Sequence, residues 1–291
     1  MASGVPTNRT NITLPADVSA EIIQKTQTDS AIMQLARQIT LPGRGLAVPV
    51  ISADPEAGWV GETAKKPVAD PTVGTKMMQP YKLAVIVPFS NEFRRDADAL
   101  YSALVERLPL ALAKKFDETV VGGTAPGTGF DVLTSCQKQE IGTDAYAGLV
   151  AADADIAEHG GDLNGIALAP AGKAVLLGAV DKNDRPLFIN NASEGAIPYI
   201  LGAPTYISKG VEDKTNDVVG VAGDWTQAMY GTVEGVKIDI SDQATLTAGT
   251  AQSPVQINLF QQNMFAVRAE IELGFIADTA CFNLLTANPE S

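Results

Sequence analysis

Few residues in this chain have the types and spacing that enzyme chemistry requires. Its 291 residues contain one histidine, His159, and two cysteines, Cys136 and Cys281. A Ser-His-Asp or Cys-His arrangement would have to use His159, and a zinc site needs more such ligands than the chain offers. His159 precedes Gly160, where we expect a helix to end, so we interpret it as a C-terminal cap. The cysteines lack metal or redox spacing and are interpreted as buried thiols of a reducing compartment.

A glycine run has part of the spacing of a phosphate-binding loop but lacks the lysine of that motif. In "GGTAPGTGF", Gly122 and Gly127 have the required four-residue gap. Thr128 and Gly129 then stand where the motif has lysine and Ser or Thr. Because the lysine that neutralises phosphate charge is missing, we interpret the run as a flexible connection.

A second polar stretch has part of the spacing of a calcium loop. In "DKNDRPLFINNA", Asp181 and Asn183 offer spaced oxygen ligands. The fifth position is Arg185, and the twelfth is Ala192 rather than the bidentate glutamate. A cation beside an arginine loses the charge advantage of such sites, so a polar turn is the better interpretation.

Two carboxylate pairs complete the chemical inventory. Asp153 and Asp155 stand two residues apart in an expected helix, where such side chains face apart. Glu270 and Glu272 share one face of an expected strand, and a solvated sheet face explains them more simply than catalysis. We therefore predict no catalytic residue, no cofactor and no bound metal, and we interpret the chain as not an enzyme.

The composition is that of a folded acidic protein. The chain is 45% hydrophobic and 19% charged, with a net charge of −13 and a pI near 4.5. A basic footprint for nucleic acid is absent, which argues against phosphate binding as its main role. No run approaches 18 apolar residues and the N-terminus lacks an apolar signal region, so we predict no membrane span and a cytoplasmic product.

The periodicity predicts an α+β fold. Helical spacing predicts two short helices between residues 15 and 39, with Asp29-Ser30 as a helix start. The clearest helix covers residues 94–121, where Pro109 removes one backbone donor and predicts a kink or local loosening near Val105. Further helices are expected around residues 143–161 and after Pro170, and strand-like runs follow without a regular βαβ repeat. The apolar stripe of the long helix recurs every four residues, at Leu100, Leu104, Leu108, Leu112 and Phe116.

The stretch from residue 57 to residue 93 raises the main question of the sequence. It reads as a long two-stranded ribbon of Pro, Gly and Lys that nevertheless carries Trp59, Met77 and Met78. An isolated hairpin is marginal in water, so the ribbon needs a surface to lie on. Either these apolar side chains fold back into the core of the same chain or they pack on another copy.

The order of several motifs resembles the major capsid proteins of tailed bacteriophages, from about Leu14 to Leu285. The most specific piece is the ribbon, where Trp59-Val60-x-Glu62 precedes a strand ending in Val87-Pro88-x-Ser90-x-Glu92. A long helix follows, as in that family. The glycine loop "GTAPGTGFDVL" and the segments "YILGAPTYIS", "VGVAGDW" and "NMFAVRAEIELGFIADTACFNLL" resemble its later segments in the same order.

The resemblance implies the tailed-phage major capsid fold. Its parts are an N-terminal arm, an extended β-hairpin loop, a long spine helix in a peripheral domain, and an axial domain. The expected boundaries are 1–44 for the arm and first helices, 45–90 for the extended loop, 91–124 with 232–291 for the peripheral domain, and 125–231 for the axial domain.

The resemblance also implies a structural protein that assembles with itself into hexamers and pentamers of an icosahedral head around double-stranded DNA. It implies a portal, a separate scaffolding protein, a decoration protein in some relatives, DNA enclosed without sequence-specific binding, and no membrane. The expected location is the virion capsid, assembled in the host cytoplasm. The expected inter-subunit contacts are Trp59, Glu62, Lys65, Lys66, Met77, Met78, Arg94 and Arg95.

Two alternatives stay open at this point. A nanocompartment shell of the encapsulin type uses the same fold to hold a cargo enzyme instead of a genome. A cytosolic enzyme with an acidic surface and an unrecognised site is the second alternative. A monodisperse 30 kDa monomer would favour the enzyme.

Overall fold

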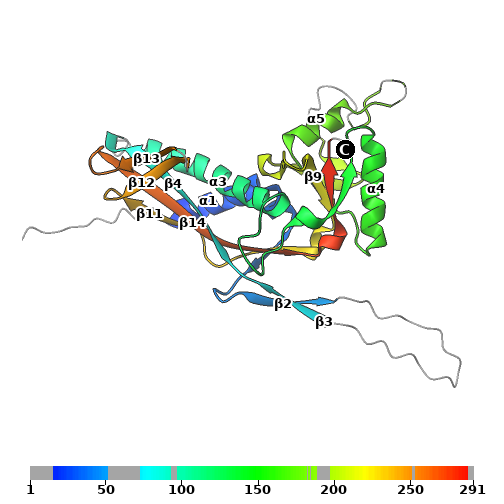
Figure 1. Cartoon of the computed structure of the whole chain (residues 1–291), viewed down its shortest axis with the longest axis horizontal. Helices are drawn as coiled ribbons and strands as arrows, with labels where there is room; N and C mark the ends of the chain where they lie inside the picture. Colours follow the sequence, from blue (N-terminus) through cyan, green and yellow to red (C-terminus); the bar gives the residue numbers. More distant parts are fainter. Residues whose placement is uncertain are drawn as a thin grey trace, which may run out of the picture.

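A computed structural model describes residues 16–51, 73–92, 97–181, 183, 185–188, 197–250 and 253–287. Figure 1 shows an elongated body with one helix-covered sheet at each end and a two-stranded hairpin that projects from its lower side. The helices and strands are mixed along the chain, so the predicted α+β class is confirmed. The helices are α1 (Ala16–Asp29), α2 (Ala31–Leu35), α3 (Ala97–Val121), α4 (Ala145–Glu158) and α5 (Pro170–Gly178).

The first sheet is built on β14 (Met264–Ala277), the longest strand of the described chain. Along one side β14 pairs antiparallel with β4 (Tyr81–Ser90), from Met264 opposite Ser90 to Leu273 opposite Tyr81. The other side carries β11 (Lys237–Ser241) and then β10 (Ala228–Thr232), and β1 (Arg37–Thr40) lies parallel to β10.

Apolar and charged residues alternate along β14, so this sheet has one buried face and one solvent-facing side, which we call the wet face. Ala269, Ile271 and Leu273 are buried in the core under α1 and α3, whereas Glu270 and Glu272 are only partly covered. This confirms the wet face predicted from the Glu-x-Glu pattern. The stripe of α3 is buried at its described positions, where Leu108, Leu112 and Phe116 pack into the same core.

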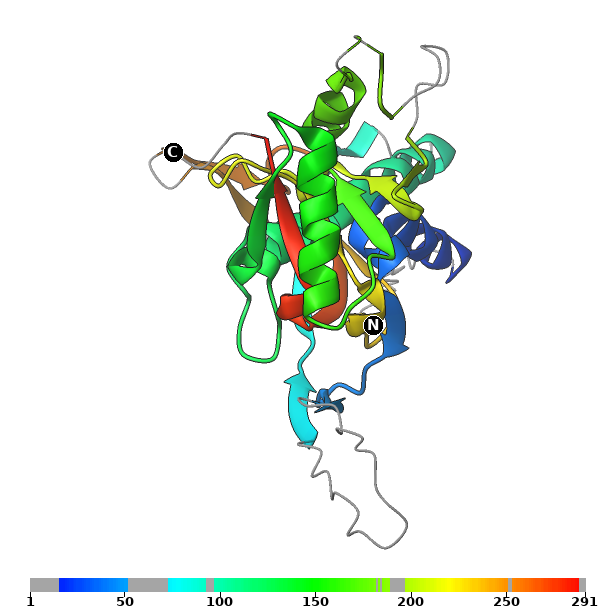
Figure 2. The same ribbon diagram turned by 90° about the vertical axis from the view of Figure 1, so that its right-hand side faces the viewer.

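The second sheet has six strands in the order β5-β15-β9-β6-β8-β7. Figure 2 shows α4 lying across this sheet at the other end of the body. Helices α4 and α5 pack on it around a separate apolar cluster that includes Leu149, Ile156, Ile166 and Leu176. The strands are β5 (Gln137–Glu140), β6 (Gly165–Leu168), β7 (Tyr199–Ile200), β8 (Ala203–Ile207), β9 (Val218–Gly223) and β15 (Phe282–Thr286).

Local signals explain the helix ends. The Ser30 hydroxyl accepts a hydrogen bond from the Met33 amide and starts α2, as predicted, and Asp144 caps α4 in the same way. His159 is the C-cap of α4, with its Nδ1 2.8 Å from the Asp155 carbonyl oxygen, which confirms its predicted role. Pro170 begins α5, where its missing amide hydrogen has no cost.

Three parts of the chain differ from the expected organisation. Residues 81–90 are not the second arm of the ribbon, because β4 pairs with β14 in the body. Residues 282–286 leave the β14 sheet and pair with β9 and β5 of the second sheet, after a short turn at Asp278. A hairpin of β12 (Thr245–Thr250) and β13 (Ser253–Asn258) was not anticipated, because its polar alternation carries little apolar signal.

A buried carboxylate joins three segments near the middle of the body. Asp117 on α3 is fully buried and accepts hydrogen bonds from the Ser30 hydroxyl at 2.6 Å and the Ala31 amide at 3.2 Å. Ser208, which follows β8, also hydrogen-bonds to it. Burial raises the pKa of Asp117 to about 6, although the hydrogen bonds from Ser208, Ser30 and Ala31 oppose the shift. The start of α2 is therefore tied to both the long helix and the second sheet.

This junction predicts a pH dependence of stability. The carboxyl of Asp117 has a pKa of about 6 when folded, against an ordinary 3.8, so the folded chain takes up a proton as the pH falls through 6. Its contribution to the free energy of unfolding should therefore grow between pH 7 and pH 5, by about 1 kcal/mol. Urea unfolding of unassembled subunits at both pH values measures this change.

The matched control is Asp117→Asn, which removes the titrating group and keeps the side-chain size. We expect the pH slope of the variant to be smaller than that of the wild type by this amount. Equal slopes in the two proteins would contradict the assignment.

Candidate inter-subunit surfaces

The projecting hairpin is held at its root by a small apolar cluster. Strands β2 (Leu46–Ile51) and β3 (Val73–Met78) pair antiparallel, with Leu46 opposite Met78 and Ile51 opposite Val73. Figures 1 and 2 both show the pair extending away from the body. Only its root is buried in the described part, where Val48 and Met78 pack with Leu41 and Ile276.

The glycine loop between α3 and the second sheet fixes this root. The Gln79 amide donates to the Gly129 carbonyl at 3.0 Å, and the Tyr81 hydroxyl donates to the Thr128 carbonyl at 2.6 Å. Gly129 has φ +79°, and a Cβ there would lie 2.4 Å from the carbonyl oxygen of Met77. The loop is thus in close contact with the hairpin root instead of being the flexible connection expected from the sequence.

An ion pair adds to this attachment. The ammonium of Lys76 lies 3.0 Å from Asp131 Oδ2 and donates to the Ala277 carbonyl at 2.9 Å. The same Asp131 oxygen accepts from the Ala277 amide at 3.1 Å. Lys76, expected only to lie on the ribbon, therefore joins β3 to the end of β14.

The two methionines of the ribbon have opposite environments. Met78 is fully buried in the root cluster, with its side chain facing the body of its own chain. The predicted contact of Met78 with a neighbouring copy is therefore wrong, and the alternative that it folds back into the core of the same chain is correct. Met77, one residue earlier, points to the other face of the strand and is 48% exposed. Met77 therefore stays a contact candidate. Trp59, Glu62, Lys65, Lys66, Arg94 and Arg95 lie outside the described residues.

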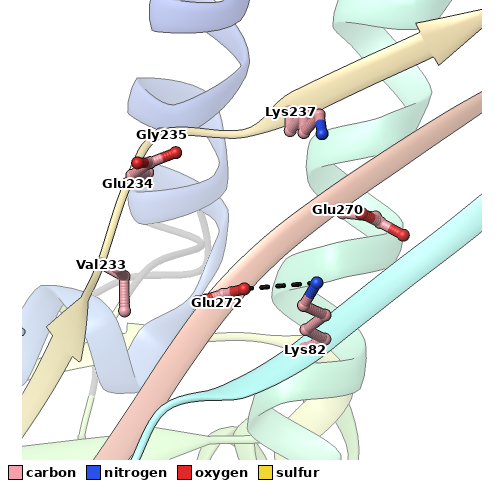
Figure 3. Close-up of a pocket in the computed structure, with 7 residues that line it drawn as sticks. All are labelled: Lys82, Val233, Glu234, Gly235, Lys237, Glu270 and Glu272. Carbon is pink, nitrogen blue, oxygen red and sulfur yellow. Dashed lines mark ion pairs between the residues drawn. The ribbon is translucent and has the colours of Figure 1, made fainter. Parts of the chain in front are cut away.

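The wet face of the first sheet carries charged side chains from neighbouring strands, and Figure 3 shows one ion pair among them, between Lys82 and Glu272. Lys82 on β4 lies opposite Glu272 on β14, with Nζ and Oε1 3.5 Å apart. Lys237 on β11 is the cross-strand neighbour of Glu270. These side chains surround a hollow of about 200 Å³ together with the Val233–Gly235 turn. Such exposed pairs contribute little to folding and leave charges available to another surface.

Several large apolar side chains are exposed on the body. Phe260, in the turn between β13 and β14, is 80% exposed, and Val255 on β13 is also exposed. Ile86 is 48% exposed on β4, which among the described strands pairs only with β14. Sequence reasoning missed this set, because Phe260 directly follows the buried Leu259 and the sequence pattern does not tell which of the two faces outward. Exposed apolar side chains that are scattered singly are normal on folded proteins, so only a contiguous patch would by itself indicate an interface.

The described residues offer little to chemistry. Within them no group of three or more His, Cys, Asp or Glu side chains is arranged to hold a metal ion, and no described helix is long and apolar enough to cross a membrane. Burial, with a smaller effect of Asp278, raises the pKa of the Cys136 thiol to about 12, which keeps it protonated and unreactive. Asp224, in the Gly-Asp-Trp motif, receives hydrogen bonds from Asn164 and Thr226 and so fixes a turn.

Comparison with known proteins points to one family. Residues 10–285 match the sequence model described as "Phage capsid family". The chain is 34% identical over 268 residues to "Probable major capsid protein gp17" of Mycobacterium phage L5, across 84% of this chain and 80% of that protein. It is 25% identical to "Major capsid protein" of Staphylococcus phage 80alpha, across 93% and 83%.

Solved structures share the fold. A chain from Gordonia phage Cozz aligns with a TM-score of 0.69 at 22% identity and covers 90% of this chain and 87% of its own length. A chain from Mycobacterium phage Adephagia aligns with a TM-score of 0.70 at 19% identity, covering 90% and 91%.

The contrast between the methionines can be tested by truncating each one. Met78→Ala leaves a cavity in the root cluster and should lower the free energy of unfolding of the unassembled subunit by about 2–5 kcal/mol. Met77→Ala removes an exposed side chain and should change it by less than about 0.5 kcal/mol. Denaturant unfolding measures both, and similar losses would contradict the assignment of the two faces.

The glycine loop provides a second test. Gly129→Ala places a Cβ against the Met77 carbonyl at a positive φ, and should cost about 1–3 kcal/mol of stability. Gly43→Ala is the matched control, because no atom lies within 4 Å of its added Cβ. Thermal unfolding should separate the two variants. Hydrogen exchange of residues 73–80 should rise only in Gly129→Ala, and unchanged exchange would argue against the attachment.

Proposed function

Since this chain belongs to the phage capsid family and is a major capsid protein of a phage head, we propose that neighbouring copies supply the cover its hairpin lacks. The chain thus has the role of a self-assembling shell component of the virion. The nanocompartment alternative is not favoured, because the curated relatives are phage capsid proteins. The family is a structural one, which speaks against the enzyme alternative.

The observation that carries the proposal is the hairpin itself. Only its root is buried in the described part of the chain, and Met77 stays exposed beside that root. A second copy that covers the hairpin adds the missing apolar contact. Obligate interfaces of this kind bury about 2,000–5,000 Å², and at about 25 cal/mol per Å² of apolar area even a modest apolar share exceeds the cost of ordering a loop.

The finer organisation follows as part of the same proposal. We assign α3 and the sheet on β14 to a peripheral domain, and the six-stranded sheet with α4 and α5 to an axial domain that includes residues 282–286. Copies form hexamers and pentamers of an icosahedral head around double-stranded DNA, in the host cytoplasm. A portal and a separate scaffolding protein act with them, and a decoration protein is a further partner.

Charge fits this arrangement. Each copy carries a net charge of −13, yet at physiological salt only charges within about 8 Å of each other interact appreciably. Local pairs at subunit borders, with Glu62, Lys65, Lys66, Arg94 and Arg95 as candidates, then set the register of contacts. An acidic shell also repels packaged DNA instead of binding it.

Electron microscopy of the purified chain tests the proposal directly. We expect closed particles or capsomer-sized rings, formed by the chain alone or with a scaffolding protein. A monodisperse 30 kDa monomer under both conditions would contradict it.

The two tryptophans offer a matched mutational test. Trp225 is buried, donates from Nε1 to the Gly165 carbonyl at 2.8 Å and contacts the Phe282 ring, so Trp225→Ala should cost about 3–5 kcal/mol and unfold the subunit early. Trp59→Ala should leave the circular dichroism and melting of the unassembled subunit nearly unchanged and lower particle yield. An early melt in both variants would make Trp59 an ordinary core residue.

A further inference from the structure

The junction at Asp117 holds a buried carboxylate without a cation to balance it. Its hydrogen-bond donors are the Ser30 hydroxyl, the Ala31 amide and the Ser208 hydroxyl. The groups that act on Asp117 in the described structure are all uncharged. A carboxylate held by neutral donors alone keeps much of its desolvation cost, and that cost disappears when the group takes up a proton or when water reaches it.

Charged side chains stand beside each segment of the junction, but they lie at the surface. On α3, Lys114 pairs with Glu118 at 3.4 Å on the outer side of the helix. Lys209, in the turn after β8, is exposed, and Asp29, at the end of α1, is only partly covered. None of the four acts on Asp117, so its protonation is governed by whether the junction is closed.

The turn η3 (Lys209–Val211) lies directly against the long helix. A Cβ added at Gly210 would lie 2.4 Å from the Lys114 carbonyl oxygen and 2.7 Å from Asp117 Cβ. The Ser208 hydroxyl accepts a hydrogen bond from the Gly210 amide at 3.2 Å and also bonds to Asp117. The turn is therefore closed onto α3 without space for another atom, and the carboxylate fastens it there.

The segments that meet at the junction belong to different parts of the body. Helix α1 packs on α3 beside the first sheet, whereas α2 contacts β6 and β8 of the second sheet. The turn η3 continues from β8. A change at the junction therefore acts on the attachment of the second sheet to the long helix.

The two serines suit both protonation states of the carboxyl. A hydroxyl can donate to a charged carboxylate or accept from a neutral carboxyl, so the junction can stay closed in either state. Only the charged form gains from exchanging neutral donors for water. We propose that the Asp117 junction is a pH-sensitive joint, in which the charged carboxylate favours separation of α2 and η3 from α3 and the neutral carboxyl keeps them together. The inference concerns the single subunit and does not depend on the proposed shell function.

The size of the effect follows from the two environments of the carboxyl. Burial raises the pKa of Asp117 to about 6 in the closed junction, and the pKa returns toward 3.8 when water reaches the group. Acid therefore stabilises the closed junction, and raising the pH through 6 removes this stabilisation. Between pH 5 and pH 8 the ratio of open to closed junctions should rise about tenfold.

Hydrogen exchange of unassembled subunits measures this opening. The reporters are the amides of Ala31, Met33 and Gly210, which are hydrogen-bonded within the junction. After correction for the intrinsic exchange rate, their protection should be about tenfold higher at pH 5 than at pH 8. They should also exchange faster than Val221 in the centre of the second sheet. Reporters that exchange only as slowly as Val221 would overturn the joint, because global unfolding alone would then expose them.

Two acid-to-amide changes on neighbouring positions separate this joint from a general effect of pH. Asp117→Asn removes the titrating group, so the protection of the reporters should change by less than about twofold between the two pH values. Glu118→Gln, at the surface one position along α3, is the matched control and should keep the tenfold change. A pH dependence that survives in Asp117→Asn, or that is lost in Glu118→Gln, would overturn the proposal.

Gly210→Ala tests the geometry without touching the titrating group. The added Cβ should push η3 away from α3, so that the α2 reporters lose protection at pH 5 and the Asp117 carboxyl titrates at lower pH in carbon-13 NMR. Gly178→Ala, where no atom lies within 4 Å of the added Cβ, should do neither. If Gly210→Ala does not fold, the titration of the wild type decides. One aspartate signal that shifts near pH 6 and is missing in Asp117→Asn supports the joint, and the lack of such a signal overturns it.

Discussion

The structure depends on the fact that a two-stranded hairpin cannot provide its own apolar cover. An isolated two-stranded hairpin is marginally stable at best in water. Among the residues of β2 and β3 whose burial is described, only Val48 and Met78 at the root are buried against the body. The remaining contacts that fix the root are polar and directed: the Lys76–Asp131 pair and the hydrogen bonds of the glycine loop. These hold the direction of the hairpin without burying its length. Cover for the rest of the hairpin is the contribution that we propose for neighbouring copies.

The same division between buried and available surface recurs in the body. The core under β14 is aromatic, with Phe116, Phe130 and Phe275 in mutual contact. The opposite face of the sheet has charged pairs at the surface, and the edge strand β4 carries the exposed Ile86. Monomeric proteins normally protect the edge strand of a sheet. The exposed edge of β4 is consistent with the association of subunits in the phage capsid family, to which the chain belongs.

Much of this arrangement could be predicted from sequence because its signals are local. The Ser30 and Pro170 helix starts, the His159 cap and the alternation around Glu270 each depend on a few neighbouring residues. Partner choice in sheets is not local, and for that reason β4 was assigned to the ribbon although it pairs with a strand near the far end of the chain. Periodicity also cannot tell which of two adjacent methionines faces the body. The surface candidates outside the described residues stay predictions.

The attachment of the hairpin to the glycine loop has a mechanical consequence. That loop follows directly on the long helix, and its backbone at Gly129 leaves no space for even one added carbon. Bending at the hairpin root would have to break these contacts. Adjustment of the subunit to regions of different curvature in a closed surface is therefore expected as rotation of the whole body together with the hairpin root. The direction in which the hairpin leaves the body is therefore expected to be the same in every copy of the subunit.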